Sequence, residues 1–368
     1  DYQSIKFTIE GAEHLHLNEH GDLMIGTKYL GELPISKPIS YQITASGERK
    51  YLQTIYVQNG NNFSYLVLDP IDPTLELIID PQLKYSTFLF CWTCSNYSYD
   101  IDANNSGHAV ATGYASNSGF PTTPGAYQVI LSSSIDIFVS VLNNLGSSLI
   151  FSTFIGGTSS EFGLSVAFDA FDNVLITGSA NSSNYPVLFA AQSIMNSLGD
   201  AVVTKLNKSV NGLHFSTFLR GSNSDISKSI YIDSKNNVLV CGVTSSQNFP
   251  ITLGALKTSI QPNTAGQFHQ DGFVTKYNSF GKLIYSTYIG ETHADGASSI
   301  TTDKYDNIYV GGSTSSSDFM VTKFGYDTSY NGAGDGFMLK LDSTLSSLIY
   351  STYIGGNFNE SIRNIVVS

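Results

Sequence analysis

The nine residues Leu348–Gly356 read LIYSTYIGG, and close copies of this stretch occur earlier in the chain. The aromatic residues before Ser-Thr are separated by 66, 64, 70 and 65 residues, at Tyr85, Phe151, Phe215, Tyr285 and Tyr350. A period of this length indicates a repeat architecture in which each repeat is one supersecondary unit. The stretch therefore marks one structural position in successive units.

The third unit, residues 227–290, shows what one repeat contains. Four strand-like runs follow one another: SIYID, VLVCG, DGFVTKY and KLIYSTYIG, with the turn signals SKNN and NSFG inside the first and second pairs. Runs of this kind separated by short turns predict an antiparallel meander of four strands. The other units keep the register: aspartates close the first strand and precede the third, and glycines end the second. These residues are Asp102, Asp169, Asp233 and Asp303; Asp136, Asp200, Asp271 and Asp335; and Gly113, Gly178, Gly242 and Gly312.

The fourth strand of each unit carries bulky residues on both faces. Tyr350, Thr352 and Ile354 alternate with Ile349 and Tyr353, and successive residues of a strand point to opposite faces. A sheet that is apolar on both faces must be covered twice, as happens when four-stranded sheets pack face to face around an axis. We therefore expect an all-β protein with a β-propeller of four-stranded antiparallel blades. The predicted blades are about 99–157, 165–221, 228–291 and 298–356, with a partial fifth blade at 361–368 and the propeller region as a whole at 83–368. LIYSTYIGG would be an outer strand. The glycine pairs Gly156-Gly157 and Gly355-Gly356 would suit a tight exit toward the next inner strand, where positive φ or a close backbone approach is expected.

Residues 1–82 precede the repeats and form a separate β-rich domain by the same criteria. HLHLNEHGDLMI, from His14 to Ile25, has a glycine-containing turn between apolar pairs and predicts a hairpin. Further strand-like runs follow up to Ile79, broken by NGNN and DPIDP. The domain boundary is expected near Pro81.

The repeats resemble the bacterial SBBP (seven-bladed beta-propeller) family. The resemblance covers about Leu83 to Ser368 and is carried by LIYSTYIGG, DNIYVGGSTSSSDF, GFPTTPGAYQ and DGFVTKYNSFGKL. Residues 1–80 resemble the β-rich domain that commonly precedes such repeats, which implies that this domain is incomplete at its start. The resemblance implies a secreted or cell-surface protein without established enzymatic chemistry. The chain departs from the family pattern at FLFCWTCSNYS, where Gly-Gly is replaced, and at Met320, where the family has proline.

Composition excludes some partners. The net charge is −12 and charged residues make up only 13%, without a Lys/Arg cluster. Nucleic acid and anionic lipid are therefore poor partners. No apolar run approaches the roughly 20 residues that span a bilayer, so no membrane insertion is expected in this segment.

The recurrent aspartates are the first candidates for chemistry. Oxygen ligands repeated around an axis would suit Ca²⁺, and a structural calcium ion is one alternative. Turn chemistry is the other and is favoured, because Asp and Asn between two strands bond their own backbone and tolerate positive φ. No twelve-residue calcium loop is present, and no other cofactor is expected.

Cysteine and histidine give weaker signals. Cys91 and Cys94 in CWTC are a candidate local disulfide or two inert thiols, because a redox CxxC needs a helix amino terminus; Cys241 would be free. The histidines on the predicted hairpin are expected to be exposed, and the others fall at different blade positions without an obvious common site. These residues are His14, His16 and His20, and His108, His214, His269 and His293.

Long segments between the second and third strands are expected to gather on one face of the propeller. They begin with ANSSNYP, TSSQNFP and TSSSDFM, where the aromatic residue would plug the seam between blades. For the Ser and Asn residues, ordinary solvated loops are favoured, and binding of a sugar or a protein is the alternative. The favoured function is a non-catalytic extracellular or cell-surface scaffold for adhesion or display, with a protein or glycan partner and self-assembly left open. The alternatives are a glycan-binding lectin with equivalent pockets between blades, a subunit of a surface filament, and a polysaccharide-processing enzyme with carboxylates in the axial funnel.

Overall fold

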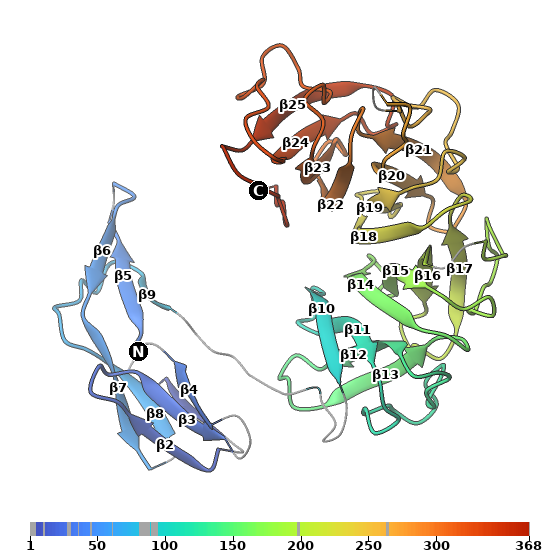
Figure 1. Ribbon diagram of the computed structural model, residues 1–368. Helices are drawn as coiled ribbons and strands as arrows, with labels where there is room; N and C mark the ends of the chain where they lie inside the picture. The colour runs from blue at the N-terminus through green and yellow to red at the C-terminus, as the bar shows by residue number, and fades with distance from the viewer. Residues whose placement is uncertain are drawn as a thin grey trace. The chain divides into compact units, whose positions relative to one another are not determined.

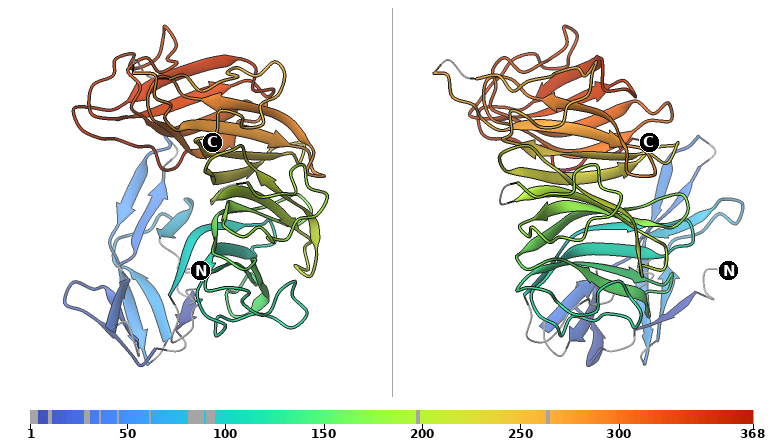
Figure 2. Two further views of the ribbon diagram at one scale, coloured as in Figure 1. Left: turned by 45° about the vertical axis from the view of Figure 1, so that its right-hand side comes forward. Right: turned by 90° about the vertical axis from the view of Figure 1, so that its right-hand side faces the viewer.

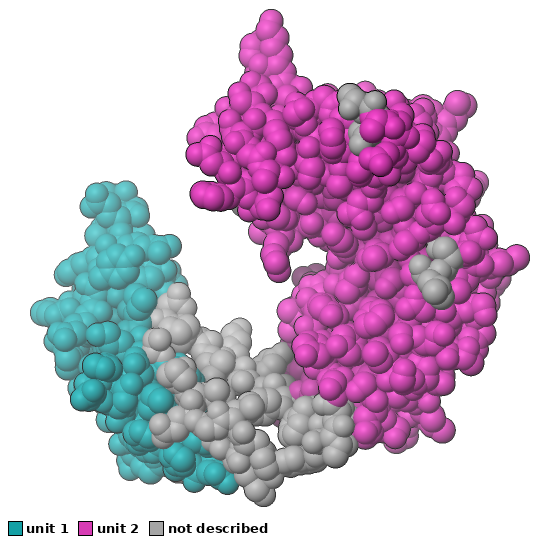
Figure 3. All heavy atoms as spheres, viewed as in Figure 1, with its two compact units in different colours: residues 1–86 teal, residues 87–368 magenta. Residues whose placement is uncertain are grey.

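The computed structural model describes residues 5–9, 12–27, 31–35, 37–44, 46–60, 62–80, 89, 95–196, 199–262 and 265–367. The chain forms two compact units, residues 1–86 and residues 87–368 (Figure 3). Every regular element in the described part of both units is a β-strand, so the predicted all-β class is confirmed. Within those same ranges, no helix has the length and apolar character needed to cross a membrane.

Unit 1 contains three small sheets, ordered β1-β8-β7, β2-β3-β4 and β6-β5-β9 (Figure 1). The strands are β1 (Lys6–Thr8), β2 (His14–Leu17), β3 (Leu23–Thr27), β4 (Gly31–Ile35), β5 (Ile39–Ile43), β6 (Arg49–Leu52), β7 (Thr54–Asn59), β8 (Asn62–Val67) and β9 (Leu77–Asp80). β2 and β3 pair antiparallel, which confirms the predicted hairpin. The buried core of unit 1 includes Leu23, Tyr56 and Phe63.

Unit 2 contains four sheets of four antiparallel strands, each in chain order. We call these sheets blades 1 to 4. Blade 1 has β10 (Asn96–Ala103), β11 (Ala109–Ala115), β12 (Asp136–Leu142) and β13 (Leu149–Ile155), and blade 2 has β14 (Glu161–Phe168), β15 (Val174–Ala180), β16 (Asp200–Leu206) and β17 (Leu213–Leu219). Blade 3 has β18 (Asp225–Ile232), β19 (Val238–Thr244), β20 (Asp271–Tyr277) and β21 (Leu283–Ile289), and blade 4 has β22 (Asp295–Thr302), β23 (Ile308–Thr314), β24 (Asp335–Leu341) and β25 (Leu348–Ile354). The predicted meander of four strands is therefore confirmed in all four complete repeats.

Successive blades pack face to face, with their first strands side by side along the inner edge (Figures 1 and 2). β10 contacts β14, β14 contacts β18 and β18 contacts β22. Tyr288 and Ile289, neighbours on β21 with opposite faces, are both fully buried. The aromatic residues of the repeat are thus covered on both faces, as the sequence predicted, and LIYSTYIGG forms the outer strand β25 with its exit turn.

The recurrent glycine of the second strand has a steric cause. In every blade the first strand contains a β-bulge opposite this residue, for example between Ser227 and Ser229. A Cβ atom at Gly242 would lie 2.0 Å from the carbonyl oxygen of Ile226, and the equivalent glycines meet the same obstacle. Since a bulge bends its strand toward the partner, only a residue without a side chain fits there.

The recurrent Ser-Thr pair has two separate roles. In blades 1 to 3 the serine pairs with a hydroxyl on the third strand, as Ser286 Oγ does with Thr275 Oγ1 at 2.9 Å. The threonine binds the long loop of its own blade. Thr153 Oγ1 accepts a hydrogen bond from the backbone N–H of Gln128 at 2.9 Å and donates one to the backbone carbonyl of Gln128 at 3.1 Å. A short motif is therefore repeated because it joins three segments of one blade.

The long loops do not gather on one face, and that prediction is wrong. Each loop turns back along the outer edge of its own fourth strand and bonds to its backbone, as Leu188 N does to Ser216 O at 2.9 Å and Thr252 N to Ser286 O at 3.2 Å. An uncovered fourth strand would expose a row of unpaired backbone groups to other chains. Pairing the loop with this edge satisfies those groups.

The segment predicted as a partial fifth blade, 361–368, contains no strand in its described residues 361–367. A first strand gains its ladder from the second strand of its own blade, and these residues pair with none. They nevertheless lie against blade 4, where Ile362 N donates to Gly312 O and Ile365 N to Ser299 Oγ, both at 3.1 Å. The first copy of the outer-strand motif, Leu83–Phe90, was expected to be donated to the last blade and close the ring, but only Leu89 of it is described. The candidate disulfide residues Cys91 and Cys94 lie outside the described residues.

Candidate functional site

Pairs of carboxyl groups lie at the contacts between consecutive blades. We call these contacts seams and the residues the seam carboxylates. Each pair joins the aspartate that begins a third strand to the carboxylate that begins the first strand of the next blade, except at the last pair, where Glu360 follows β25 outside a strand. The pairs are Asp136 with Glu161, Asp200 with Asp225, Asp271 with Asp295, and Asp335 with Glu360.

The second member of each pair was missed in the sequence. Its signal was a constant spacing of 25, 25, 24 and 25 residues after the aspartate of the third strand. Each second carboxylate accepts the backbone N–H four residues before it, for example Gly221 N to Asp225 Oδ2 at 2.7 Å and Gly356 N to Glu360 Oε2 at 3.0 Å. The carboxylate therefore closes the exit turn of the preceding blade.

In blade 1, the Gly-Gly exit leaves room for the seam carboxylates. A Cβ atom at Gly156 would lie 2.4 Å from Asp136 Cγ and 2.8 Å from Glu161 Oε2, and one at Gly157 would lie 2.5 Å from Ser182 Cβ. Of the two reasons proposed from sequence, close approach holds here and positive φ does not, because neither glycine is among the residues with positive φ. The turn and the seam carboxylates thus depend on each other.

Burial raises the pKa of the second carboxylate at the first two seams. Burial raises the pKa of Glu161 to about 7, and nearby Asp136 raises it further while a hydrogen bond from Ser182 opposes the rise. Burial likewise raises the pKa of Asp225 to about 6, against hydrogen bonds from Thr244 and Gly221. Two carboxylates close together in a dry site favour retention of a proton. Glu161 and Asp225 therefore titrate near neutral pH.

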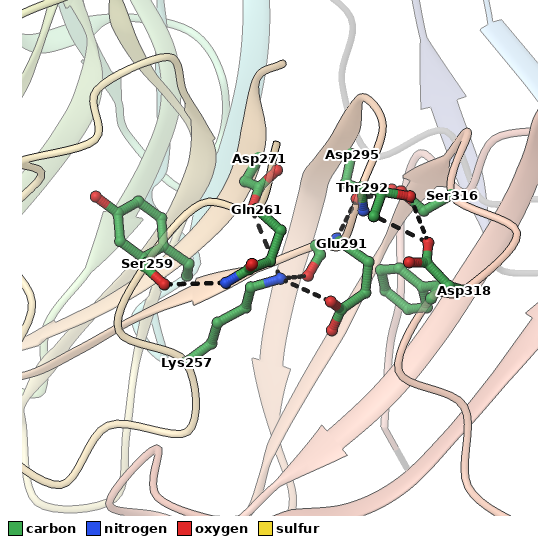
Figure 4. A network of polar contacts seen from close by, with 12 residues as sticks. Lys257, Ser259, Gln261, Asp271, Glu291, Thr292, Asp295, Ser316 and Asp318 are labelled. Atoms are coloured by element: carbon green, nitrogen blue, oxygen red, sulfur yellow. Dashed lines mark hydrogen bonds and ion pairs between the residues drawn. The ribbon is translucent and has the colours of Figure 1, made fainter. Parts of the chain in front are cut away.

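The seam between blades 3 and 4 contains a cation (Figure 4). Lys257 Nζ lies 3.1 Å from Glu291 Oε2 and 4.0 Å from Asp271 Oδ2, and it donates to the Gly290 carbonyl. Asp295 Oδ2 accepts from Glu291 N at 2.6 Å and from Ser316 Oγ at 2.9 Å. Neither oxygen of Asp271 accepts a hydrogen bond from a described residue, and burial raises the pKa of Asp271 to about 8 although Lys257 opposes the rise.

Blades 1 and 2 have glutamine at the position of Lys257. Gln128 Nε2 donates to Asp136 Oδ2 at 2.8 Å, and its Oε1 accepts from Gly156 N at 3.2 Å. Gln192 bonds the backbone N–H and carbonyl of Arg220, each at 2.9 Å. One loop position therefore supplies either a neutral amide or a cation to the seam.

The second group of aspartates caps turns at the other end of the strands. Asp169 Oδ1 accepts from the backbone of Phe171 and Asn173, and Asp169 Oδ2 lies 2.7 Å from Lys205 Nζ. These bonds outweigh burial and hold the pKa of Asp169 below its usual value. Turn chemistry thus accounts for Asp169, Asp233 and Asp303, as predicted, with the addition of buried lysines that the sequence analysis missed.

Lys205 and Lys276 also join consecutive blades. Lys205 Nζ donates to Ser279 O of blade 3 at 3.3 Å, and Lys276 Nζ donates to Ser343 O of blade 4 at 3.2 Å. Blade 1 has Val141 at this position, and Asp102 Oδ2 accepts from the backbone N–H of Phe168 at 2.7 Å. Across the described ranges, no group of three or more His, Cys, Asp or Glu side chains is placed to hold a metal ion.

Ser and Asn side chains at the loop starts form hydrogen bonds within the fold. Ser246 is fully buried and donates to Asp225 Oδ2 at 3.0 Å. Asn248 Oδ1 accepts from Ser222 N at 2.8 Å. The predicted aromatic plug of the seam is confirmed: Phe249 is 4% exposed and belongs to a buried cluster that contains residues of both blade 2 and blade 3.

The histidines are exposed or paired with ordinary neighbours. His14, His16 and His20 are exposed, as predicted. His269 and His293 stack with ring centroids 5.8 Å apart, so two histidines from different blade positions do come together. Cys241 is free and buried, and burial raises the pKa of its thiol.

Two open surfaces remain after the internal bonds are assigned. One is a cleft of about 540 Å³ along the inner strands, where Asp100 Oδ2 accepts from Ser165 Oγ at 2.6 Å and from Val166 N at 2.9 Å. The other consists of aromatic side chains on turns and loops. Their exposed fractions are 69% at Phe171, 78% at Phe189, 82% at Phe280, 85% at Phe324 and 89% at Tyr326.

Comparisons with known proteins support the architecture. Residues 220–250 and 284–319 match the SBBP family, described as a beta-propeller repeat, and residues 1–82 match a domain of unknown function, DUF7948. No curated protein matches the chain.

Similar solved structures are remote. A protein of unknown function from Bacteroides caccae is 10% identical with a TM-score of 0.32, over 95% of this chain and 93% of that chain. One from Dyadobacter fermentans is 8% identical with a TM-score of 0.37, over 96% and 86%. BamB from Moraxella catarrhalis is 10% identical with a TM-score of 0.27, over 100% and 94%. These TM-scores are too low for any of the three to carry an argument.

Proposed function

Because this chain carries SBBP beta-propeller repeats behind a DUF7948 domain, we propose that it is a non-catalytic binding scaffold at the cell exterior, with a protein or glycan partner. One observation carries the proposal. The polar residues that recur in the blades are bonded within the fold, whereas several large aromatic side chains are more than two-thirds exposed. Exposed aromatic side chains contribute little to folding and are typical of binding surfaces.

The seams support a rigid scaffold. Seam carboxylates close each exit turn, and the lysines beneath Asp169 and Asp233 join each blade to the next. A ligand that binds such an array meets a surface fixed in advance, which lowers the entropy lost on binding. No resident cofactor is needed for this role.

The inner cleft supports binding over catalysis. A polysaccharide-processing site needs one carboxyl group to give a proton and another to act as base or nucleophile. Asp100 and Asp102 each accept backbone N–H groups of the next blade. The carboxylate oxygens of both residues are therefore engaged in the contact between consecutive blades.

The test is a binding and activity screen of the purified chain. We expect binding to a glycan array or to an extracellular protein from the source organism, together with recovery of the protein in the secreted or surface fraction. Breakdown of any polysaccharide in a panel assayed with and without Ca²⁺ would overturn the scaffold proposal and show that the protein is an enzyme. Polymers in negative-stain images of native material would show instead that the protein is a filament subunit.

A further inference from the structure

A hollow of about 580 Å³ lies on the outer surface of unit 2 where blades 2 and 3 meet. Phe171, Phe189 and Phe280 line it, together with His214, Asn173 and Lys205. Three separate segments supply the rings: the turn between β14 and β15, the long loop of blade 2, and the turn between β20 and β21 of blade 3. The hollow therefore exists only when the two blades are packed together.

Phe189 adopts a backbone conformation that does not suit it. Its φ is 47°, in the left-handed region that bulky residues rarely occupy. The equivalent loop positions in blades 1 and 3 are Gly125 and Gly254, with φ of 79° and 82°. Blade 4 also has a phenylalanine there, Phe324, but Phe324 is not among the residues with positive φ. Phe189 thus carries a large side chain on the backbone conformation of the two glycines, and 78% of it is exposed to solvent. Backbone strain of this kind is typical of functional sites. The exposed ring of Phe189 gains little packing that would offset the strain.

The aromatic residues are particular to this seam. At the seam between blades 3 and 4, the positions of Phe171, Phe189 and Phe280 hold Lys235, Gly254 and Thr344. Lys205 and its equivalent Lys276 form the same bonds to the next blade at both seams. The fold therefore does not require the three rings, and their presence calls for another explanation.

The polar groups of the hollow determine which ligand suits it. Lys205 and Asp169 form an ion pair at 2.7 Å with side chains 6% and 1% exposed, so the charge at the base of the hollow is neutralised. At the rim, His214 Nε2 donates a hydrogen bond to Asn173 Oδ1 at 3.1 Å. The site combines apolar ring faces with uncharged polar edges, as small-molecule sites commonly do.

We propose that this hollow binds a neutral pyranose sugar, an assignment that rests on the proposed binding function and names its ligand class. A pyranose has a flat face of C–H groups and a rim of hydroxyls. The C–H face would stack on the phenylalanine rings, whose faces are electron-rich, and the hydroxyls would bond to Asn173 and His214. The prediction is one site per chain at the seam of blades 2 and 3, in contrast to equivalent pockets between all blades.

The experiment measures binding of neutral glucose and galactose hexasaccharides of different linkage by titration calorimetry, with polygalacturonate as a charged comparison. The whole chain is used as wild type, Phe189→Gly and Phe280→Ser. Matched controls are Tyr305→Ser and Phe324→Ser, which remove equally exposed aromatics from blade 4. We expect at least one neutral hexasaccharide to bind, about tenfold or more weaker binding in both hollow variants, and unchanged binding in both controls.

Thermal unfolding separates loss of the site from loss of the fold, because Phe189→Gly should melt no lower than wild type. Equal sugar binding by wild type and both hollow variants overturns this site while the binding function stands. Binding of an extracellular protein without any sugar has the same consequence. Failure to bind either sugar or protein overturns both proposals.

Discussion

Buried carboxyl groups have different neighbours at two seams of the propeller, the seam of blades 1 and 2 and the seam of blades 3 and 4. Both bury a pair of carboxyl groups beneath a glycine-containing exit turn. The first places the neutral amide of Gln128 beside Asp136, and the second places the ammonium group of Lys257 between Glu291 and Asp271.

At the first seam, burial raises the pKa of Glu161 to about 7. At the second, burial raises the pKa of Asp271 to about 8 although Lys257 opposes the rise, so the lysine offsets only part of the effect of burial. The comparison teaches that one fold tolerates either neighbour because the position lies in a loop.

Replacing the cation should have the largest effect. We expect Lys257→Met to lower the free energy of unfolding by about 3 kcal/mol at pH 9, because it leaves buried carboxylates without a counter-charge. The loss should shrink at pH 6, since Asp271, whose pKa is about 8, then carries a proton. Urea unfolding at both pH values measures it.

Gln192→Met is the matched control for Lys257→Met, because it removes a neutral amide from the same loop position. Its cost should be about 1 kcal/mol and independent of pH. Equal, pH-independent losses in the two variants would show that Lys257 does not balance the seam charge.

Glu161→Gln should remove a pH dependence. The folded pKa of Glu161, about 7, lies above its ordinary value of 4.5, so the wild-type protein has the full contribution below pH 4.5 and loses it as the pH rises through 7. Between pH 4.5 and pH 8, the unfolding free energy of Glu161→Gln should gain about 2 kcal/mol on the wild type, an amount reduced for partial solvent screening. Chemical unfolding across this range measures the gain.

Asp225→Asn sharpens the same comparison at the next seam. Because the pKa of Asp225 is raised only to about 6, the gain should be smaller and complete at lower pH. A pH-independent difference for both variants would contradict the assignment of shared protons to the seams.

The outer strands provide a smaller contrast between blades 3 and 4. Ser286 Oγ pairs with Thr275, whereas Ser351 faces Leu339 and its hydroxyl has no hydrogen-bond partner in the described structure. Ser286→Ala should therefore cost about 1 kcal/mol, and Ser351→Ala should cost nothing. Denaturant midpoints compare the two, and a larger loss for Ser351→Ala would contradict the role given to the repeated serine.

The smallest effect is expected at the strained loop, with the opposite sign. Phe189→Gly should raise the unfolding free energy by up to about 1 kcal/mol, because glycine adopts positive φ without strain. Gly254→Phe, the reverse change at the equivalent position of blade 3, should lower it by about 1 to 2 kcal/mol, since a Cβ there meets open space and only backbone strain acts. Differential scanning calorimetry measures both, and destabilisation by Phe189→Gly would show that the ring packs against the fold.

Within one blade, the sequence by itself determined almost everything. LIYSTYIGG, the turn signals and the two-faced apolar pattern predict four strands, their order and their burial, because strand pairing in a meander is local in the chain. The path of the long loops was not predictable this way, since it depends on unpaired backbone groups along the outer strand.

Between blades, the tertiary structure decided the outcome. Asp136 lies beside Glu161 of the next blade, and Lys205 donates a hydrogen bond to a backbone carbonyl of the next blade. The hollow at Phe189 is likewise lined by residues of two blades. The spacing of 24 or 25 residues between seam carboxylates was present in the sequence, but spacing alone does not reveal that two acids share a dry site. Burial, which shifts a pKa, and exposure, which leaves a ring available to a ligand, are properties of packed surfaces, and they arise only when one blade covers the next.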